Sequence, residues 1–297
     1  MPKVPYKKPA LPITDQIAKL KSRGLVFSDV SFAEEFLTCV NYYRLSGYSL
    51  AYEQDHALHT FKQGTTFEDL VLLYNFDKKL RSILFEGISC FEVSLRTQWA
   101  YQVGMNLGAH AYTDPVNAID LQKYKDNLDA ILTEYKRSSE LFVKHFQNTY
   151  QETLPPVWVA CEVLSLGTLS RLYKNLAYGK AKNDIARFYG IDVALLESWV
   201  HCITVLRNHC AHQSRLVNKN FSISPLVPKS KKLQIRSLWL NSKKAYNLIL
   251  LLCHLVSKIS IDKCWKTELV SFLKKEATFA EKFLDFPHDW YKDPFWN

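Results

Sequence analysis

The sequence predicts an all-α fold in which the helices pack together as a bundle. Only 9 glycines and 11 prolines occur in 297 residues, which argues against a turn-rich architecture of β-strands. Apolar residues recur at spacings of three, four and seven from Phe67 to about Val103, the pattern of one long helix. A hydrophobic fraction of 47% with 13% aromatic residues is typical of a globular chain with a sizeable core.

The N-terminal part predicts an extended arm followed by two short helices. Residues 1–12 form the arm, and a first helix has Thr14 as its N-cap and Gly24 as its stop. The segment "SFAEEFLTCVNYYRLSGY" predicts a second helix that ends near Gly47. After it, the extended stretch "SLAYEQ" and the turn region around "KQGTTF" predict a small hairpin or an irregular lid.

The longest helix begins at Phe67. Thr66 can cap its first turn, where Asp69 adds a favourable negative charge. Residues 104–118 are rich in small polar residues and predict a loop. The charged segment "DLQKYKDNLDAILTEYKRSSELFVKHFQNTY" then predicts either two helices or one helix interrupted near Ser138.

The second half of the chain is also helical. Pro155 and Pro156 open a helix with the sequence "VWVACEVLSLGTLSRLYKNL", because proline is tolerated in a first turn. A short helix, "AKNDIARFYGI", follows, and Asp192 caps the next one. Two further helices are expected at about 237–258 and 262–284.

No repeat or low-complexity tract divides the chain. We expect an N-terminal helical extension, one large helical domain and an aromatic tail, "FPHDWYKDPFWN", that packs on the bundle. The corresponding ranges are 1–66, 67–285 and 286–297.

The charge and cysteine content predict a cytoplasmic protein that meets polyanions. The net charge of +9 favours partners such as RNA, DNA or acidic proteins. Seven dispersed cysteines, without a C-x-x-C, are typical of reduced thiols. The start "MPKVPYKKPALP" lacks the apolar core of a signal peptide, and the longest apolar run, "LILLLCHLV", is too short to span a bilayer.

The segment "LRNHCAH", residues 206–212, places a cation and two imidazoles at the end of a helix with a buried face. At roughly 100° per residue, one stripe of this helix is apolar and a second, on roughly the opposite side, is polar. Arg207 lies at the edge of the apolar stripe, where a cation needs a partner. The apolar stripe contains Leu196, Trp199, Val200, Ile203, Leu206 and Cys210. The polar stripe contains Glu197, His201, Thr204, Asn208, His212 and Arg215.

Three interpretations of this segment are open. The first is a solvated helix end from which Arg207 snorkels. The second is a metal site at His201, His209 and His212, but no acidic or cysteine partner has suitable spacing, so we expect neither metal nor cofactor. The third is metal-free RNA cleavage, which needs a base for the 2′-hydroxyl proton, a cation for the phosphate and a positioned polar group.

The spacing from Arg207 to His212 is an R-x4-H motif, and here the sequence resembles HEPN-domain ribonucleases. Over essentially the whole chain it resembles the Abi-like (AbiD/AbiF) abortive-infection family of bacteria. The segments that carry this resemblance are "QIAKLKSRGL", "NYYRLSGY", "FDKKLRSILFEGISCFEVSLRT", "WVACEVLSLGTLSRLYKNL", "LRNHCAHQSRL" and "FPHDWYKDPFW".

The resemblance implies a HEPN-type helical bundle and metal-free cleavage of single-stranded RNA that leaves a 2′,3′-cyclic phosphate. It also implies a role in phage defence or as the toxin of a toxin–antitoxin system. Arg207 and His212 would be the catalytic pair, with Asn208 in the polar position that follows the arginine. Glu92 or Arg96 would orient Arg207, although these two can equally form a simple surface ion pair one turn apart.

Other residues are candidates for RNA contacts. Arg215, one turn beyond His212, can hold phosphate or cap the helix. Tyr43 and Arg44 can stack on bases and grip the RNA backbone, or the tyrosines can dock the N-terminal helices. The basic segment "PKSKKLQIR" is an electrostatic track or a solvated loop. The lysines concerned are Lys229, Lys231 and Lys232, together with Lys7 and Lys8.

The resemblance also implies partners. HEPN nucleases usually assemble one site from two facing motifs, which predicts a homodimer with two Arg207/His212 pairs. A toxin implies an antitoxin, either a small structured RNA or a protein.

Two alternatives to the nuclease remain. A non-catalytic RNA-binding or sensor module would tolerate the loss of His212, and a scaffold for an acidic protein would lack salt-dependent RNA affinity.

Overall fold

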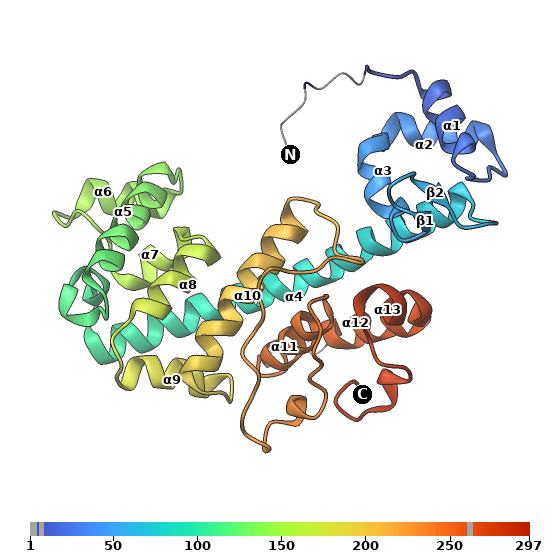
Figure 1. Cartoon of the computed structure of the whole chain (residues 1–297). Helices are drawn as coiled ribbons and strands as arrows, with labels where there is room; N and C mark the ends of the chain where they lie inside the picture. Colours follow the sequence, from blue (N-terminus) through green and yellow to red (C-terminus); the bar gives the residue numbers. More distant parts are fainter. Residues whose placement is uncertain (1–4, 6–8, 260–263) are drawn as a thin grey trace. The chain divides into compact units, whose positions relative to one another are not determined.

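Helices account for nearly all the regular structure of this chain. The computed structural model describes Pro5 and residues 9–259 and 264–297. Within these residues the only strands form one antiparallel hairpin, β1 (Glu53–Asp55) and β2 (Thr60–Phe61), and two isolated bridges accompany it. The predicted all-α fold is therefore confirmed. The chain forms two units, residues 1–79 and 80–297 (Figure 1). The sequence-based division at 66 and 285 stays a prediction.

The first unit gathers three short helices, the hairpin and the start of a long helix. Gly24, with a φ of +90°, ends the first helix as predicted. Of the two alternatives expected for the stretch that follows, the chain forms a hairpin, but its turn lies at residues 56–59, ahead of the turn region expected around "KQGTTF". The core of the first unit consists of side chains from several elements. The helices are α1 (Ile13–Ser22), α2 (Val30–Cys39), α3 (Tyr42–Ser49) and α4 (Phe67–Leu107). The core residues include Leu20, Leu37, Leu45, Phe61 and Phe67.

Two predictions for the first unit were wrong. Thr14 is no N-cap, because α1 begins one residue earlier, at Ile13. The single helix expected up to Gly47 is two helices. The chain is extended at Val40, with φ −121° and ψ 104°, and the Asn41 side chain then caps α3 by accepting a hydrogen bond from the Tyr43 amide.

Helix α4 begins with a reciprocal cap. The Thr66 hydroxyl accepts a hydrogen bond from the Asp69 amide at 3.1 Å, and the Asp69 carboxylate accepts one from the Thr66 amide at 2.8 Å. The predicted cap is confirmed. The helix continues past Val103 to Leu107 and is followed by Gly108 at a φ of +105°.

In the second unit, α10 packs against α8, α9 and α11 (Figure 1). Its predicted apolar stripe is buried, with Trp199, Ile203 and Leu206 fully covered. The elements after α4 are η1 (Ala111–Thr113), η2 (Pro115–Asn117), α5 (Leu121–Arg137), α6 (Leu141–Thr149), α7 (Val157–Val163), α8 (Leu166–Asn175), α9 (Lys180–Phe188), α10 (Val193–Ala211), η3 (Gln234–Arg236), α11 (Tyr246–Val256), α12 (Cys264–Lys275), α13 (Ala277–Leu284) and η4 (Trp290–Lys292).

Several predicted helices are interrupted. The helix expected after Pro156 divides into α7 and α8, because Leu164 is extended and the Ser165 hydroxyl accepts a hydrogen bond from the Thr168 amide at 3.2 Å. Of the two alternatives near Ser138, the chain forms separate helices, α5 and α6.

The last two predicted helices also differ from the structure. The first, expected at 237–258, begins only at Tyr246. The second, expected at 262–284, breaks at Glu276, whose φ of −106° and ψ of 35° leave the helical region. Its predicted start at 262 lies outside the described residues.

Helix α12 packs closely on α4 at a glycine. The Trp265 ring lies so near Gly87 that a Cβ atom at this position would overlap the ring. The Trp265 indole N–H donates to the Ile83 carbonyl at 2.6 Å.

Among the described residues no single helix is both long and apolar enough to cross a membrane. The pair α9–α10 has the length and composition of a span, but its two helices are bent by 64° relative to each other.

Candidate functional site

The R-x4-H segment occupies the last turn of α10. Asp192 caps the start of this helix by accepting a hydrogen bond from the Leu195 amide at 2.8 Å, as the sequence predicts. At the other end, α10 stops at Ala211, and His212 takes the C-cap position with its amide donating to the Asn208 carbonyl at 3.0 Å. Buried contacts of the apolar stripe thus fix the helix that presents the motif.

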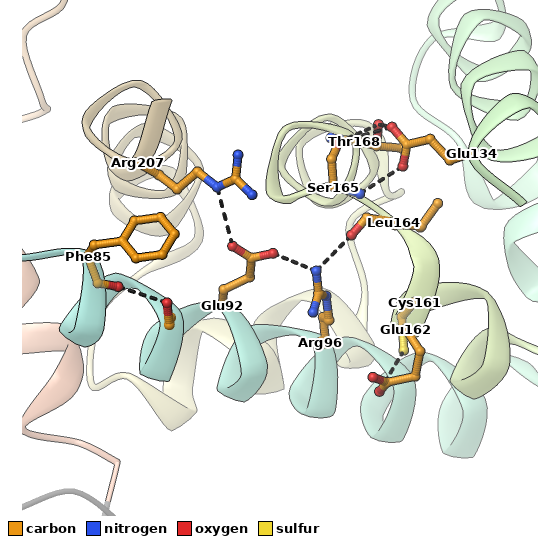
Figure 2. Close-up of polar contacts among 11 residues, drawn as sticks. Phe85, Glu92, Arg96, Glu134, Cys161, Glu162, Leu164, Ser165, Thr168 and Arg207 are labelled. Carbon is orange, nitrogen blue, oxygen red and sulfur yellow. Dashed lines mark hydrogen bonds and ion pairs between the residues drawn. The ribbon is translucent and has the colours of Figure 1, made fainter. Parts of the chain in front are cut away.

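Arg207 faces the long helix α4 through Glu92. One carboxylate oxygen of Glu92 lies 3.8 Å from the Arg207 Nε, and the other accepts a hydrogen bond from Arg96 at 2.5 Å. Arg96 also donates to the Leu164 carbonyl at 2.9 Å, where α7 gives way to α8. Figure 2 shows the resulting row from Arg207 through Glu92 and Arg96 to Leu164. Of the two residues expected to orient Arg207, Glu92 faces it directly and Arg96 fixes Glu92.

Glu92 orients the Arg207 guanidinium but does not occupy its hydrogen-bond donors. Its Nε is buried and has no hydrogen-bond partner among the described residues, because 3.8 Å to Glu92 exceeds hydrogen-bond length. The attraction to Glu92 is therefore electrostatic. Figure 2 shows one of the two terminal nitrogens directed away from Glu92 and draws no hydrogen bond from either of them. A guanidinium offers five N–H donors in a fixed plane, so Arg207 can still bind an anionic group such as a phosphate.

An open cleft of about 460 Å³ lies beside Arg207, Glu92 and Arg96. Sequence reasoning missed two further residues that line it, Glu134 and Arg137, because they lie on α5 and belong to no motif. The Glu134 carboxylate is engaged at the start of α8, where it accepts a hydrogen bond from the Ser165 amide at 2.7 Å. The remaining residues of the cleft are Ser138, Glu140, Glu162, Val163, Leu164 and Ser165.

Asn208 and His212 are exposed beyond the cleft. Neither side chain has a hydrogen-bond or ion-pair partner in the described part of the chain, and the structure records no contact between His212 and Arg207. The motif therefore places its cation in a cleft and its histidine on the surface. Both can meet a large ligand.

His209 has a packing role. Its ring lies edge-on to Phe221, with 5.4 Å between ring centres. Burial, the charge of Lys219 and the neighbouring His212 lower its pKa, so the ring is neutral at pH 7. No group of three or more His, Cys, Asp or Glu side chains gathers in a metal-binding arrangement within residues 9–259 and 264–297.

The tyrosines of the "NYYRLSGY" segment have different environments. Tyr48 is buried and donates to Asp77 at 2.8 Å, and the Tyr42 hydroxyl accepts a hydrogen bond from Arg23 at 3.0 Å. These two tyrosines pack within the first unit. Tyr43 is 85% exposed.

The remaining candidate cations are scattered. Arg44 lies 5.9 Å from the centre of the Tyr74 ring, in the first unit, and Arg215 is half-buried after α10. Arg215 does not line the cleft beside Arg207.

The lysines of the basic segment, Lys229, Lys231 and Lys232, are exposed ahead of η3. Lys232 lines a groove with Arg187 and Lys258. Lys7 and Lys8 lie outside the described residues.

These features define an all-α protein with an open cleft, lined by three arginines and four glutamates, at the end of a buried helix. A family model described as "Abi-like protein" matches residues 35–218, which is more than half of the chain. The chain belongs to this family. The matched region contains α4, α8 and α10, and therefore all the residues of the Arg207 row. No curated protein and no solved structure matches the chain.

Proposed function

We propose that this protein is a metal-independent endoribonuclease of the HEPN type that acts in the cytoplasm, in phage abortive infection or as the toxin of a toxin–antitoxin system. The observation that carries the proposal is the orientation of Arg207 and the availability of its hydrogen-bond donors. This arginine lies in the family-matched region, is oriented by Glu92 and keeps free donors at an open cleft. A cation held in this way suits the charge that develops on a phosphate during cleavage.

In the proposed reaction the 2′-oxygen of the RNA attacks the adjacent phosphorus and the bond to the 5′-oxygen breaks. His212 takes the proton from the 2′-hydroxyl or gives one to the leaving 5′-oxygen. Arg207 stabilises the phosphorane-like transition state, and Asn208 orients one of the reacting groups. The products are a 2′,3′-cyclic phosphate and a 5′-hydroxyl, so the reaction consumes no water. It needs no metal because His212 moves the proton and Arg207 stabilises the charge.

The reactive unit would be a homodimer. Within the described part of one chain His212 has no partner, and two facing motifs would supply two Arg207/His212 pairs, so that base and acid come from different copies. A toxin also needs an antitoxin, either a small structured RNA or a protein. The net charge of +9 favours the RNA.

Cleavage of total RNA in EDTA by purified wild type and single variants tests the proposal. We expect His212→Ala to lower the rate by about 10²- to 10⁴-fold and Arg207→Ala by about 10²- to 10³-fold. Asn208→Ala should have a smaller effect in the same direction. His145→Ala, which removes an exposed histidine from α6, is the matched control and should cut as wild type does. Unchanged cleavage by His212→Ala would contradict the proposal.

The alternative is a non-catalytic RNA-binding or sensor module. It is favoured by the separation of His212 from Arg207 within one chain. If none of the proteins cuts RNA, and all bind it with similar affinity except Arg207→Ala, this alternative replaces the nuclease.

A further inference from the structure

Two open clefts of the second unit meet at one exposed aromatic ring, Tyr178. The first, of about 970 Å³, lies between α5, α8 and α10. The second, of about 1090 Å³, lies between α9, the start of α10, the basic segment before η3 and Lys258 after α11. Because Tyr178 lines both, we treat them as one surface, the Tyr178 groove. Its cationic and aromatic side chains include Arg171, Lys174, Tyr178, Arg187, Lys232 and Lys258.

Tyr178 is exposed and yet supported from behind. The side chain is 72% exposed, between α8 and α9. The ammonium of Lys182 lies 4.6 Å from the centre of its ring. Lys182 itself is fully buried and fixed by the Leu176 carbonyl at 2.8 Å and the Glu197 carboxylate at 2.7 Å. A fixed cation against one part of the ring positions Tyr178 while leaving the rest of its surface open to a stacking partner.

The cations of the groove stand on both sides of this ring. Lys174 lies in the first cleft, and Lys232 and Lys258 lie in the second. None of these three ammonium groups has a hydrogen bond or an ion pair within the described residues. Lys258 crosses Gly190, where the φ of +69° and the absence of a side chain let the lysine approach the backbone.

The carboxylates of the groove, in contrast, have local partners. Asp120 pairs with Lys123, Asp126 accepts a hydrogen bond from Gln122, Asp192 caps α10 and Glu197 binds Lys182. Two of these carboxylates are paired with a lysine and two are held by hydrogen bonds, so the charged groups of this described surface that have neither are the three ammonium groups. Phosphates can approach them without displacing an existing ion pair.

We propose that the Tyr178 groove binds single-stranded RNA, with Tyr178 stacked on one base and Lys174, Lys232 and Lys258 on phosphates at either side. Aromatic rings interleaved with cations bind single strands, because an unpaired base offers its face to the ring and a paired base does not. The inference rests on the proposed function and deepens it by naming where the substrate strand is held outside the reacting groups.

Helix α10 connects the groove to the motif. Glu197 and His201 line the first cleft, whereas Asn208 and His212 are exposed towards the other end of the same helix. At 1.5 Å per residue, His201 and His212 are about 16 Å apart along the axis. A strand of a few nucleotides can cover that distance, so the groove can hold RNA while the motif acts on it.

Equilibrium binding to a labelled single strand of about a dozen nucleotides, within the usual range of single-strand site sizes, and to its duplex tests the groove. All proteins carry His212→Ala, so that the probe stays intact. Adding Tyr178→Ala should weaken binding to the single strand about 10-fold or more and bring its affinity close to that for the duplex. Tyr178→Phe should keep the affinity of the parent, because it keeps the ring. Tyr101→Ala, at a tyrosine 59% exposed on α4, is the control and should change nothing.

The salt dependence of binding tests the lysines. Lys232→Ala with Lys258→Ala should lower the slope of log K against log salt by about 1.4, since each phosphate contact to a single strand contributes about 0.7. Lys144→Ala, at an exposed lysine on α6, is the control. Unchanged binding by Tyr178→Ala, or an equal loss in Tyr178→Phe and Tyr178→Ala, would overturn the stacking role. An unchanged slope would overturn the phosphate contacts.

Failure of the groove and failure of the nuclease can be told apart. The groove is judged by binding in proteins that all lack His212, and the nuclease by cleavage with Tyr178 intact. A wild type that cuts RNA together with a Tyr178→Ala variant of parental affinity would reject the groove and leave the reaction standing.

Discussion

Glu92 holds two guanidinium groups with a single, largely buried carboxylate. It accepts a 2.5 Å hydrogen bond from Arg96 and faces Arg207 at 3.8 Å. The shorter contact fixes the carboxylate, and the longer one attracts Arg207 without consuming its donors. This division of contacts makes Glu92 a positioning residue in the proposed site.

We predict that Glu92→Gln lowers kcat about 10- to 100-fold, because Arg207 loses the charge that orients it at the phosphate. KM for RNA should not rise, since a negative charge leaves the cleft. Initial rates of multiple-turnover cleavage measured at several RNA concentrations separate the two constants. Glu86→Gln, an exposed position on the same helix, is the control. A rise in KM at constant kcat would show that Glu92 acts in binding instead.

His254 makes the stability of the second unit sensitive to acid. Burial, with a smaller contribution from the charge of Lys258, lowers its pKa from the ordinary 6.5 to about 4, and its ring lies 3.1 Å from the Tyr189 carbonyl. The unfolded chain binds a proton at pH values between these two and the folded chain does not. The contribution of His254 is therefore fully present above pH 6.5 and is lost as the pH falls towards 4.

We predict that the free energy of unfolding falls, through His254, by about 2 kcal/mol between about pH 7 and pH 5. Urea unfolding of wild type and of His254→Gln at both pH values measures this contribution. Glutamine can still donate to the Tyr189 carbonyl but does not titrate. The free energy of unfolding of His254→Gln should therefore fall about 2 kcal/mol less than that of wild type between pH 7 and pH 5. Equal pH dependence of the two proteins would rule out His254 as the cause.

At the level of helices, continuous patterns were easier to predict from the sequence than interruptions. The burial of α10 followed from its apolar stripe, and its start followed from Asp192. The breaks at Val40 and Leu164 were missed, because Asn41 and Ser165 cap new helices where the apolar pattern runs on. In these places a local side-chain hydrogen bond prevails over periodicity.

The candidate site was predictable only where one helix carries it. Arg207, Asn208 and His212 belong to one segment at the end of α10, and their spacing was visible in the sequence. The cleft beside Arg207 was not, because Glu134 and Arg137 come from α5 and meet α4 and α10 only through tertiary packing. The spacing of residues along the chain does not predict which helices pack together, so it could not predict this cleft.

Gly87 allows α12 to dock on α4. We predict that Gly87→Ala destabilises the second unit by about 1–3 kcal/mol, because the new methyl group would overlap the Trp265 ring. Urea unfolding followed by Trp fluorescence measures the change. Gly179→Ala is the matched control, since a Cβ atom there would have nothing within 4 Å, and it should stay within about 0.5 kcal/mol of wild type. Similar stability of the two variants would mean that α12 is not held by this contact.

For the whole molecule, the proposed nuclease function and the net charge agree on RNA as the partner. The family match covers residues 35–218, and the net charge is +9. A basic surface attracts RNA at long range but does not choose where it binds. We propose that RNA binds at two specific places on the second unit, the Arg207 cleft and the Tyr178 groove.

The proposed homodimer predicts complementation between inactive chains. Arg207→Ala and His212→Ala, each inactive by itself, should regain part of the wild-type cleavage when mixed and allowed to exchange subunits. One half of the composite site in the mixed dimer then supplies Arg207 and the other supplies His212. Light scattering should give twice the chain mass of 34.5 kDa. A fully active wild type at the mass of one chain would refute the composite site.

The chemistry of the cut ends tests the central claim most directly. Wild type would be incubated with RNA in EDTA, and the fragments treated with a phosphatase that removes 3′-phosphates only after acid opens a cyclic phosphate. The account predicts 2′,3′-cyclic phosphate and 5′-hydroxyl ends that are absent with His212→Ala. Fragments with 3′-hydroxyl ends would contradict attack by the 2′-oxygen, and cleavage that EDTA abolishes would contradict a metal-free reaction.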